Sequence, residues 1–226
     1  RTQTKGLEVI RLPHFVHPSR KIAVRAAGYI SSALSQCLAA LFSEKADIVL
    51  VIGPPLVGPI LAAGVAARFH ASLATVIFDL YPDIAIETYA VAHPWSVCGA
   101  RRAEKLQYDL SDLLIVPSFG FKQTLIKKGV LERKVAVVPV WLDAERIRPG
   151  TKDTNLRRRM GIAPDTFVAM VAGTVGRVSG ASVIVEAARL LKNEKDILFL
   201  FVGEGEEKPR LQRAVEKAVL SNVRFL

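Results

Sequence analysis

The stretch TFVAMVA-GTVGRVSG-ASVIVEAARLL, residues 166–191, guides the interpretation of the rest of the chain. It begins with a mostly apolar, β-branched run, continues through a glycine-rich turn, and ends with apolar residues at helical spacing. A strand that passes through a glycine turn into a helix is the repeating unit of a parallel α/β sheet. The stretch therefore predicts one such unit.

The same rhythm of strand and helix runs through the whole sequence. Strands are expected at Leu7–Arg11, Asp47–Ile52, Leu73–Phe78, Leu113–Pro117, Val135–Pro139, Thr166–Ala172, Ile197–Val202 and Val223–Leu226. Helices are expected at about Ser19–Ser43, Leu56–Phe69, Trp95–Ser111, Phe119–Lys128, Ala181–Leu191 and Glu206–Leu220. This alternation predicts an α/β fold with parallel sheets, and the apolar strands favour sheets that helices cover on both faces.

A change in composition divides the chain. Residues 141–150 are charged and end on Pro-Gly, as a linker would, and the strand–helix rhythm restarts after Asp165. We therefore expect two Rossmann-like, doubly wound domains, residues 1–145 and residues 146–226. Both are expected to be incomplete: the first without its opening strand, the second without its later half.

Composition limits the classes of function. The 226 residues are 50% hydrophobic and carry a net charge of +10, which favours anionic partners such as phosphorylated metabolites or an anionic membrane surface. The longest basic run, Arg157–Arg159, is expected to be a solvated helix face, so we expect no nucleic-acid partner. The two isolated cysteines exclude a disulfide framework and a cysteine-based zinc site, and they favour a reducing compartment. The uncharged run Ile48–Ala67 contains prolines and glycines, which favour a strand, a turn and a buried helix over a membrane span.

Two glycine turns follow expected strands, where ligands of such sheets bind. In residues 172–180, Gly173 and Gly176 would allow close backbone approach to a phosphate, and Arg177 would add an anion donor. A tight turn with a solvated arginine is an equally good interpretation of these residues alone. In residues 202–208, three glutamates would repel a phosphate, so we do not expect this loop to hold the diphosphate. Glu206 and Glu207 are expected to favour the start of the following helix, with a nucleoside contact through the glycine backbone as the alternative.

Asp79 is a third candidate, because it follows an apolar strand and would point into the crevice. Asp83 is expected to be structural, as the N-cap of a short helix that begins at Ile84. The helix at residues 19–43 has a basic start and an apolar face, which favour core packing over contact with anionic headgroups. No arrangement of His, Cys, Ser or Asp supports a hydrolase or a metalloenzyme.

Taken in order, these elements resemble the family 4 glycosyltransferases of the GT-B fold, and more closely the branch that builds bacterial exopolysaccharides and capsules. The resemblance covers nearly the whole chain, and the residues that carry it are DIVLVIGPPL (47–56), FDLYPD (78–83), VPS (116–118), KGV (128–130), PVWLD (139–143), AGTVG (172–176), EAA (186–188) and VGEGE (202–206).

The resemblance implies a cytoplasmic enzyme, peripheral on the inner face of the plasma membrane. It would transfer a sugar from a nucleotide-sugar to a glycan or lipid-linked acceptor, with retention of configuration and without a metal or resident cofactor. Carried over by position, Gly173, Thr174, Gly176 and Arg177 would meet the donor diphosphate and Gly203 and Gly205 the nucleoside, while Asp79 would be catalytic on the acceptor side. Preorganised N–H groups and a guanidinium suit this chemistry, because negative charge builds on the departing nucleoside diphosphate.

The chain departs from the family in several ways. No lysine accompanies Arg177, and Val140 stands where an asparagine is common. The family's first glycine loop would lie before Arg1 and its paired glutamates beyond Leu226, so the chain is expected to be a fragment that is inactive alone. Two alternatives stay open: a GT-B sugar-nucleotide epimerase, and a non-catalytic remnant that binds nucleotide or membrane.

Overall fold

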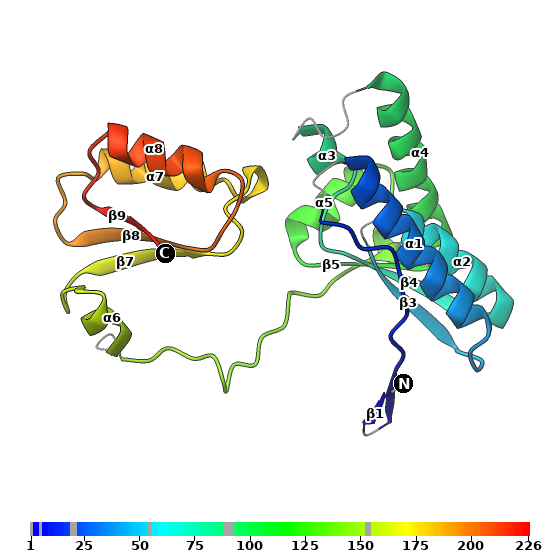
Figure 1. The fold of residues 1–226 in the computed structure, drawn as a ribbon. Helices are drawn as coiled ribbons and strands as arrows, with labels where there is room; N and C mark the ends of the chain where they lie inside the picture. The colour runs from blue at the N-terminus through cyan, green and yellow to red at the C-terminus, as the bar shows by residue number, and fades with distance from the viewer. Residues whose placement is uncertain (1, 5, 19–21, 54–55, 88–92, 152–154) are drawn as a thin grey trace. The chain divides into compact units, whose positions relative to one another are not determined.

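The computed structural model describes residues 2–4, 6–18, 22–53, 56–87, 93–151 and 155–226. The chain forms two compact units, Arg1–Trp141 and Leu142–Leu226 (Figure 1). The expected boundary, between residues 145 and 146, lies within the same exposed segment.

Unit 1 is built on a parallel sheet in the order β3-β4-β5-β6. The strands are β3 (Ile48–Gly53), β4 (Ser72–Ile77), β5 (Leu113–Val116) and β6 (Val135–Val137). The helices are α1 (Ile22–Leu41), α2 (Val57–Phe69), α3 (Asp83–Glu87), α4 (Pro94–Leu110) and α5 (Phe119–Lys127), with the 3-10 turn η1 (Glu132–Lys134). The charge-free run at residues 48–67 is thus a strand followed by a helix, as the prolines predicted, although Pro54 and Pro55 lie outside the described residues.

One face of this sheet carries the core. Leu73 of β4 packs with α2, while Ile77 of the same strand and Leu114 of β5 pack with α4 and α5. The opposite face of β3 is open: Ile48, Leu50 and Ile52 are 60–65% exposed. The prediction of helices on both faces is therefore wrong for β3 among the described residues. Apolar side chains on both faces of a strand do not reveal whether the same chain covers both.

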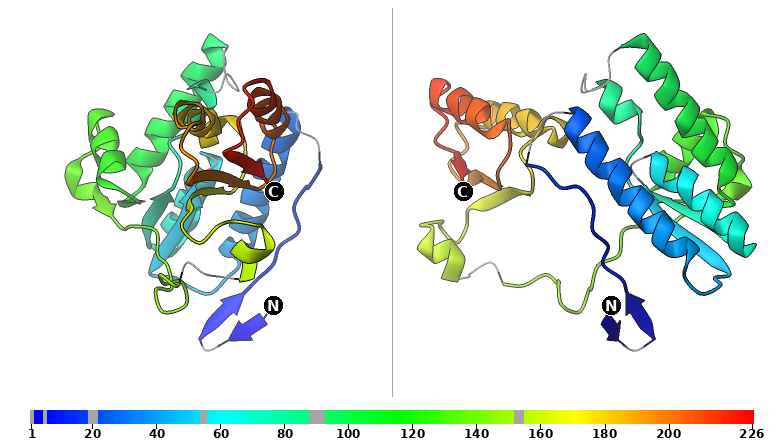
Figure 2. Two further views of the ribbon diagram at one scale, coloured as in Figure 1. Left: turned by 90° about the vertical axis from the view of Figure 1, so that its left-hand side faces the viewer. Right: turned by 45° about the vertical axis from the view of Figure 1, so that its right-hand side comes forward.

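The first expected strand is not part of this sheet. β2 (Leu7–Val9) pairs antiparallel with β1 (Thr2–Thr4) in a two-stranded sheet of its own. The pairing follows a tight turn at Gly6, whose φ of +81° suits glycine. Further along, the Phe15 N–H donates to the Ser31 hydroxyl at 2.9 Å, which ties the following extended segment to α1. α1 itself lies beside α2 (Figure 2).

Residues 138–151 are exposed throughout and lead into α6 (Asn155–Arg159), the first helix of unit 2. Arg157–Arg159 were expected to form a solvated basic face, but the Arg157 side chain is bonded to the backbone instead. Its Nη2 donates to the carbonyl oxygens of Ala163, Pro164 and Thr166 at 3.1, 3.4 and 2.7 Å. The side chain therefore fastens α6 to the turn that precedes the next strand.

Unit 2 has a parallel sheet in the order β7-β8-β9, formed by Phe167–Ala172, Ile197–Val202 and Val223–Phe225. α7 (Ala181–Leu190) and α8 (Lys208–Lys217) cover one face (Figure 1). Phe201, fully buried, lies at the centre of this core and stacks on Phe225 with ring centroids 4.8 Å apart. The opposite face of the edge strand is open at Met170, which is 62% exposed.

The α/β class and the parallel sheets are confirmed, and every expected strand lies within one or two residues of an observed one. The expected helix start at residues 19–21 lies outside the described residues. The β1 strand was not predicted.

Candidate functional site

The loop after β7 places the first group of predicted residues. Gly173 leaves the strand with φ +143°, a conformation that other residues rarely adopt. Val175 then turns into the core of unit 2, where it is 1% exposed, while Thr174 on its N-terminal side and Arg177 two residues later face outward. The short 3-10 turn η2 (Arg177–Ser179) leads to Gly180, which precedes α7 in a left-handed conformation. Buried Val175 thus anchors a loop whose other residues reach solvent.

The loop after β8 packs directly against this first loop. The Gly173 N–H donates to the Val202 carbonyl at 3.0 Å, and the Val175 N–H donates to the Glu204 carbonyl at 2.9 Å. A Cβ atom at Gly203 would lie 2.0 Å from the Gly173 oxygen, and one at Gly205 would lie 2.1 Å from the Val175 oxygen. Both glycines are therefore needed for the backbones of the two loops to approach each other.

Arg177 has a carboxylate neighbour. Its Nε lies 3.5 Å from Glu206 Oε1, and both side chains are more than half exposed. The other two glutamates of this loop also have cationic partners: Glu204 binds Lys208, and Glu207 binds Arg210. Glu206 and Glu207, which were expected to favour the following helix, directly precede α8 (Lys208–Lys217), and their charges are also paired with these side chains. Their repulsion of an anion is correspondingly reduced.

Six of the predicted site residues thus lie in two adjoining loops: Gly173, Thr174, Gly176, Arg177, Gly203 and Gly205. The cause is the parallel pairing of β7 and β8, which brings the carboxyl ends of both strands to one edge of the sheet. The loops offer glycine backbone, a hydroxyl and a guanidinium, which is a suitable set for a phosphate group. That they bind a donor remains a prediction.

Asp79, the seventh predicted residue, belongs to unit 1 and is exposed just beyond the end of β4. Its carbonyl accepts from the Tyr81 N–H at 3.2 Å, and the ring of neighbouring Phe78 lies 6.4 Å from that of Trp141. Burial, and then the negative charge of Asp79, raise the pKa of Tyr81. The Asp79 carboxylate and the Tyr81 phenol therefore lie within electrostatic reach of each other.

Four charged side chains behind this loop were not predicted to meet. Lys128 bonds Asp83 and Glu104, and Arg101 bonds the same two carboxylates, so the four form a closed ring of ion pairs. The Arg101–Glu104 contact is 3.1 Å, and the Tyr108 hydroxyl donates to Glu104 at 3.1 Å. Glu104 is only 4% exposed. We call Asp83, Arg101, Glu104 and Lys128 the ion-pair ring.

The ring corrects the role expected for Asp83. Asp83 is structural, as predicted, but its carboxylate accepts from Lys128 and Arg101, on two other helical segments. Burial acts to raise the pKa of Asp83, but the two hydrogen bonds and positive charges outweigh it and hold the pKa below the ordinary 3.8. Asp83 is therefore held as a carboxylate at neutral pH. Burial, and then Glu104, raise the pKa of Tyr108.

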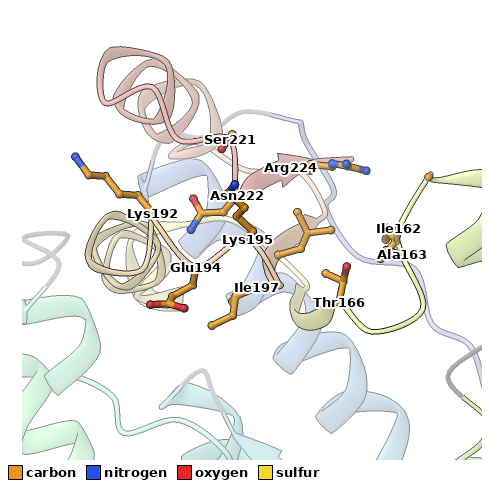
Figure 3. A pocket seen from close by; sticks show the side chains of 12 residues that line it. Ile162, Ala163, Thr166, Lys192, Glu194, Lys195, Ile197, Ser221, Asn222 and Arg224 are labelled. Atoms are coloured by element: carbon orange, nitrogen blue, oxygen red, sulfur yellow. The ribbon is translucent and has the colours of Figure 1, made fainter.

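A hollow of about 270 Å³ in unit 2 lies away from the predicted residues. It is at the amino ends of β8 and β9, where the side chains of Thr166, Asn222 and Arg224 line it (Figure 3). None of the seven predicted site residues contributes to its wall. Within the part of the chain that the structure describes, no three His, Cys, Asp or Glu side chains gather as a metal site requires.

No family model matches the sequence. Curated relatives do, over part of their length. WcaI of Escherichia coli K12, named a colanic acid biosynthesis glycosyl transferase, is 28% identical over 102 residues, covering 44% of this chain and 25% of WcaI. The D-inositol 3-phosphate glycosyltransferase of Geodermatophilus obscurus is 32% identical over 116 residues, covering 46% of this chain and 26% of that protein.

Solved structures match over more of the chain. Anabaena HepE, crystallised with UDP, superimposes with a TM-score of 0.63 at 15% identity, covering 89% of this chain and 53% of HepE. The fold is GT-B. A UDP-GlcNAc 2-epimerase from Neisseria meningitidis shares it, with a TM-score of 0.51 at 17% identity over 94% of this chain and 55% of the epimerase. The GT-B chain described here thus spans about half the length of these solved proteins and matches a quarter of the curated relatives.

The resemblance seen in the sequence is confirmed at the level of the GT-B fold and of glycosyltransferase relatives. Membership of family 4 stays a prediction. None of the helices among the described residues combines the length and the apolar character that spanning a bilayer requires.

Proposed function

We propose that this GT-B chain belongs to a glycosyltransferase that moves a sugar from a nucleotide-sugar to a polysaccharide or lipid-linked acceptor in cell-surface glycan synthesis. The observation that carries the proposal is the sequence similarity to two proteins named glycosyltransferases, in a chain with the same type of fold. The name of WcaI supports an exopolysaccharide product. HepE bound to UDP supports a uridine nucleotide as the first donor to test.

The loops of unit 2 suit the donor diphosphate. Gly173, Thr174 and Gly176 expose backbone and a hydroxyl beside the start of α7, and the Arg177 guanidinium lies at the same loop. Such groups stabilise the charge that develops as a nucleoside diphosphate departs. Gly203 and Gly205 would face the nucleoside, and Asp79 of unit 1 would act on the acceptor. Family 4 membership, retention of configuration and inactivity of the chain in isolation are parts of the same proposal.

Arg177→Ala is expected to lower kcat/KM for the nucleotide-sugar by about tenfold or more, because a charge-assisted contact contributes about 1.5–3 kcal/mol. The measurement is donor turnover by the protein of the complete reading frame. Arg189→Ala is the matched control, since Arg189 is an exposed arginine of the following helix and pairs with Glu186. If the two variants have equal donor kinetics, Arg177 does not bind the donor.

An epimerase is the second candidate, because a UDP-GlcNAc 2-epimerase shares the fold over 94% of this chain. An epimerase consumes no acceptor, whereas a transferase releases nucleoside diphosphate in proportion to the acceptor that it glycosylates. Incubation with UDP-sugars, with and without lipid-linked or glycan acceptors, separates the two. Conversion of the UDP-sugar to its epimer without an acceptor would favour the epimerase.

A cytoplasmic location at the inner face of the plasma membrane is the last part of the proposal. The net charge of +10 and the apolar, exposed Leu34, Leu38 and Phe42 in and just after α1 support it. We expect the protein to co-sediment with vesicles that contain anionic lipid, less at high salt, and to stay in solution with neutral vesicles. Replacing Leu38 and Phe42 with serine should weaken this binding. Equal recovery with both kinds of vesicle would contradict the proposal.

A further inference from the structure

The loop that carries Asp79 is anchored by its buried residues. Leu80 packs against the core of unit 1 and Pro82 is fully buried, whereas Asp79 faces solvent. The Ile84 N–H donates to the Leu80 carbonyl at 3.1 Å, and the Ile86 N–H donates to the Pro82 carbonyl at 2.9 Å, so the loop runs directly into α3. Whatever holds α3 therefore also helps to hold the loop.

The ion-pair ring holds α3. Asp83 is the first residue of that helix, Arg101 and Glu104 belong to α4, and Lys128 is the residue that ends α5. Three segments distant in sequence are thus joined at a single point: Lys128 is 45 residues from Asp83 and 24 from Glu104. Lys128 Nζ lies 2.5 Å from Asp83 Oδ2, and the Lys128 side chain is mostly buried.

The ring does not itself suit a ligand site. Its two carboxylates and two cations neutralise each other, and each carboxylate already accepts from both cations. A salt bridge buried in this way contributes little net stability compared with apolar packing, and its best-attested role is to specify one arrangement of the chain. A neutral ring four residues from a candidate catalytic carboxylate is well placed for that role.

We propose that Lys128, acting through Asp83, is a positioning residue for Asp79: the ion-pair ring fixes the 78–83 loop so that the Asp79 carboxylate is presented to the acceptor. The inference rests on the proposed function, in which Asp79 acts on the acceptor. Arg101 and Glu104 complete the ring, and their roles are to keep the Lys128 ammonium and the Asp83 carboxylate in place.

The test compares three substitutions on one helix end. Lys128→Met removes the ammonium and keeps the length of the side chain, and Lys128→Arg restores a cation. Lys127→Met is the matched control, because Lys127 is the adjacent residue, is exposed, and has no ion pair among the described residues. All three are made in the protein of the complete reading frame.

The first readout is amide hydrogen exchange, which needs no activity. The N–H groups of Tyr81, Ile84 and Ile86 are bonded within the loop and α3. We expect Lys128→Met to speed exchange in residues 79–87 by more than in the rest of unit 1 and to leave the peptides of unit 2 unchanged, whereas a purely general loss of stability would speed exchange equally throughout unit 1. Lys127→Met should match the wild type.

The second readout is sugar transfer. A displaced catalytic group costs about tenfold to a hundredfold in rate. We expect Lys128→Met to lower kcat by that factor with the donor KM unchanged, and Lys128→Arg to recover most of it. Protonation of the Asp83 carboxylate would also break its ion pairs with Lys128 and Arg101. Because Lys128→Met removes one of the two cations that lower the pKa of Asp83, the acid limb of the plot of kcat against pH should move to higher pH in this variant. Among the described residues, Asp83 faces Arg101 and Lys128, which donate to it, and Glu104 and Tyr108 lie across the ring.

The outcomes separate the two proposals. Exchange that rises most in the loop, slower transfer and recovery with arginine support the positioning role. If the wild type transfers sugar and Lys128→Met is equally active, the inference is wrong and the proposed function is unaffected. Faster exchange in the loop without a change in transfer reduces the ring to a purely structural feature. A wild type that transfers no sugar to any acceptor overturns the proposed function, and the inference falls with it.

Discussion

Gly203→Ala is expected to destabilise unit 2 by about 3–5 kcal/mol, because it combines two costs: a strained backbone and an overlap of atoms. Gly203 has φ +147°, a region that alanine adopts only under strain. The added Cβ would also lie 2.0 Å from the Gly173 oxygen and 3.0 Å from its carbonyl carbon. Backbone atoms cannot rotate away as a flexible side chain can, so the first loop itself must shift.

Thermal unfolding of the purified variant measures this effect. For a unit of this size the expected cost corresponds to a Tm lower by roughly 10 °C or more. Gly205→Ala should act in the same direction, since its Cβ would lie 2.1 Å from the Val175 oxygen. In both variants we expect UDP to raise Tm less than in the wild type, because the displaced loop carries the proposed donor contacts.

Gly176→Ala is the control for these variants. Its φ of −117° is open to any residue, and the nearest atom to an added Cβ is Thr174 Cγ2 at 3.8 Å, an ordinary contact. Its effect on stability should stay below about 1 kcal/mol. If Gly203→Ala and Gly176→Ala have the same Tm, the two loops do not approach each other as closely as described.

The glycine loops could be predicted from sequence because the signal is local. A turn of GTVG after an apolar strand and before a helical pattern specifies a βα connection by itself, and a second one follows at VGEG. The sheet then brings the two together. What the sequence did not reveal was the reason for Gly203 and Gly205, because their constraint comes from the carbonyls of Gly173 and Val175 in the loop after β7.

The ion-pair ring had no comparable signal. Its members lie on three helical segments, and charged residues on an amphipathic helix are ordinarily interpreted as a solvated face. One local hint was present: Glu104 stands four residues before Tyr108 on α4, and both are buried there. Arg157 was misjudged for the same reason, since the carbonyls that it binds lie up to nine residues away in a turn. Long-range contacts of polar groups are specified by the tertiary fold.

Coverage of the sheets was misjudged for a different reason. β3 is apolar on both faces, with Val49 and Val51 toward α2 and Ile48, Leu50 and Ile52 away from it. Such a strand is typical of a sheet covered on both sides. The apolar pattern indicates that both faces of the strand favour burial, but it does not indicate which segment or which polypeptide packs against each face.

Glu104→Ala is expected to destabilise unit 1 by about 3–5 kcal/mol, the cost of removing one partner from a buried ion pair. Glu104 is 4% exposed, and its carboxylate accepts from Lys128, Arg101 and the Tyr108 hydroxyl. The substitution leaves two cations facing the single charge of Asp83, and it leaves a buried phenol without its acceptor. Unfolding in urea, followed by the change in tyrosine absorbance as Tyr108 becomes exposed, measures the change, because Tyr108 is 5% exposed within unit 1.

Asp109→Ala on the same helix is the matched control. Asp109 is exposed and pairs with Lys105 at 3.0 Å in an i,i+4 arrangement. Exposed pairs of this kind contribute about 0.3–0.5 kcal/mol, so the control should unfold close to the wild type. A Glu104→Ala variant as stable as Asp109→Ala would contradict a buried carboxylate at this position.

The double variant Glu104→Ala, Lys128→Met decides whether the cost of Glu104→Ala comes from unpaired charge or from lost packing. If charge dominates, removing the ammonium together with the carboxylate restores a neutral site with Arg101 and Asp83 still paired. The double variant should then be more stable than the sum of the single effects predicts, by about 1–3 kcal/mol. If packing dominates, the two losses add, and the ring would be a set of independent contacts. A closed ring, in which each cation bonds both carboxylates, predicts the coupled result.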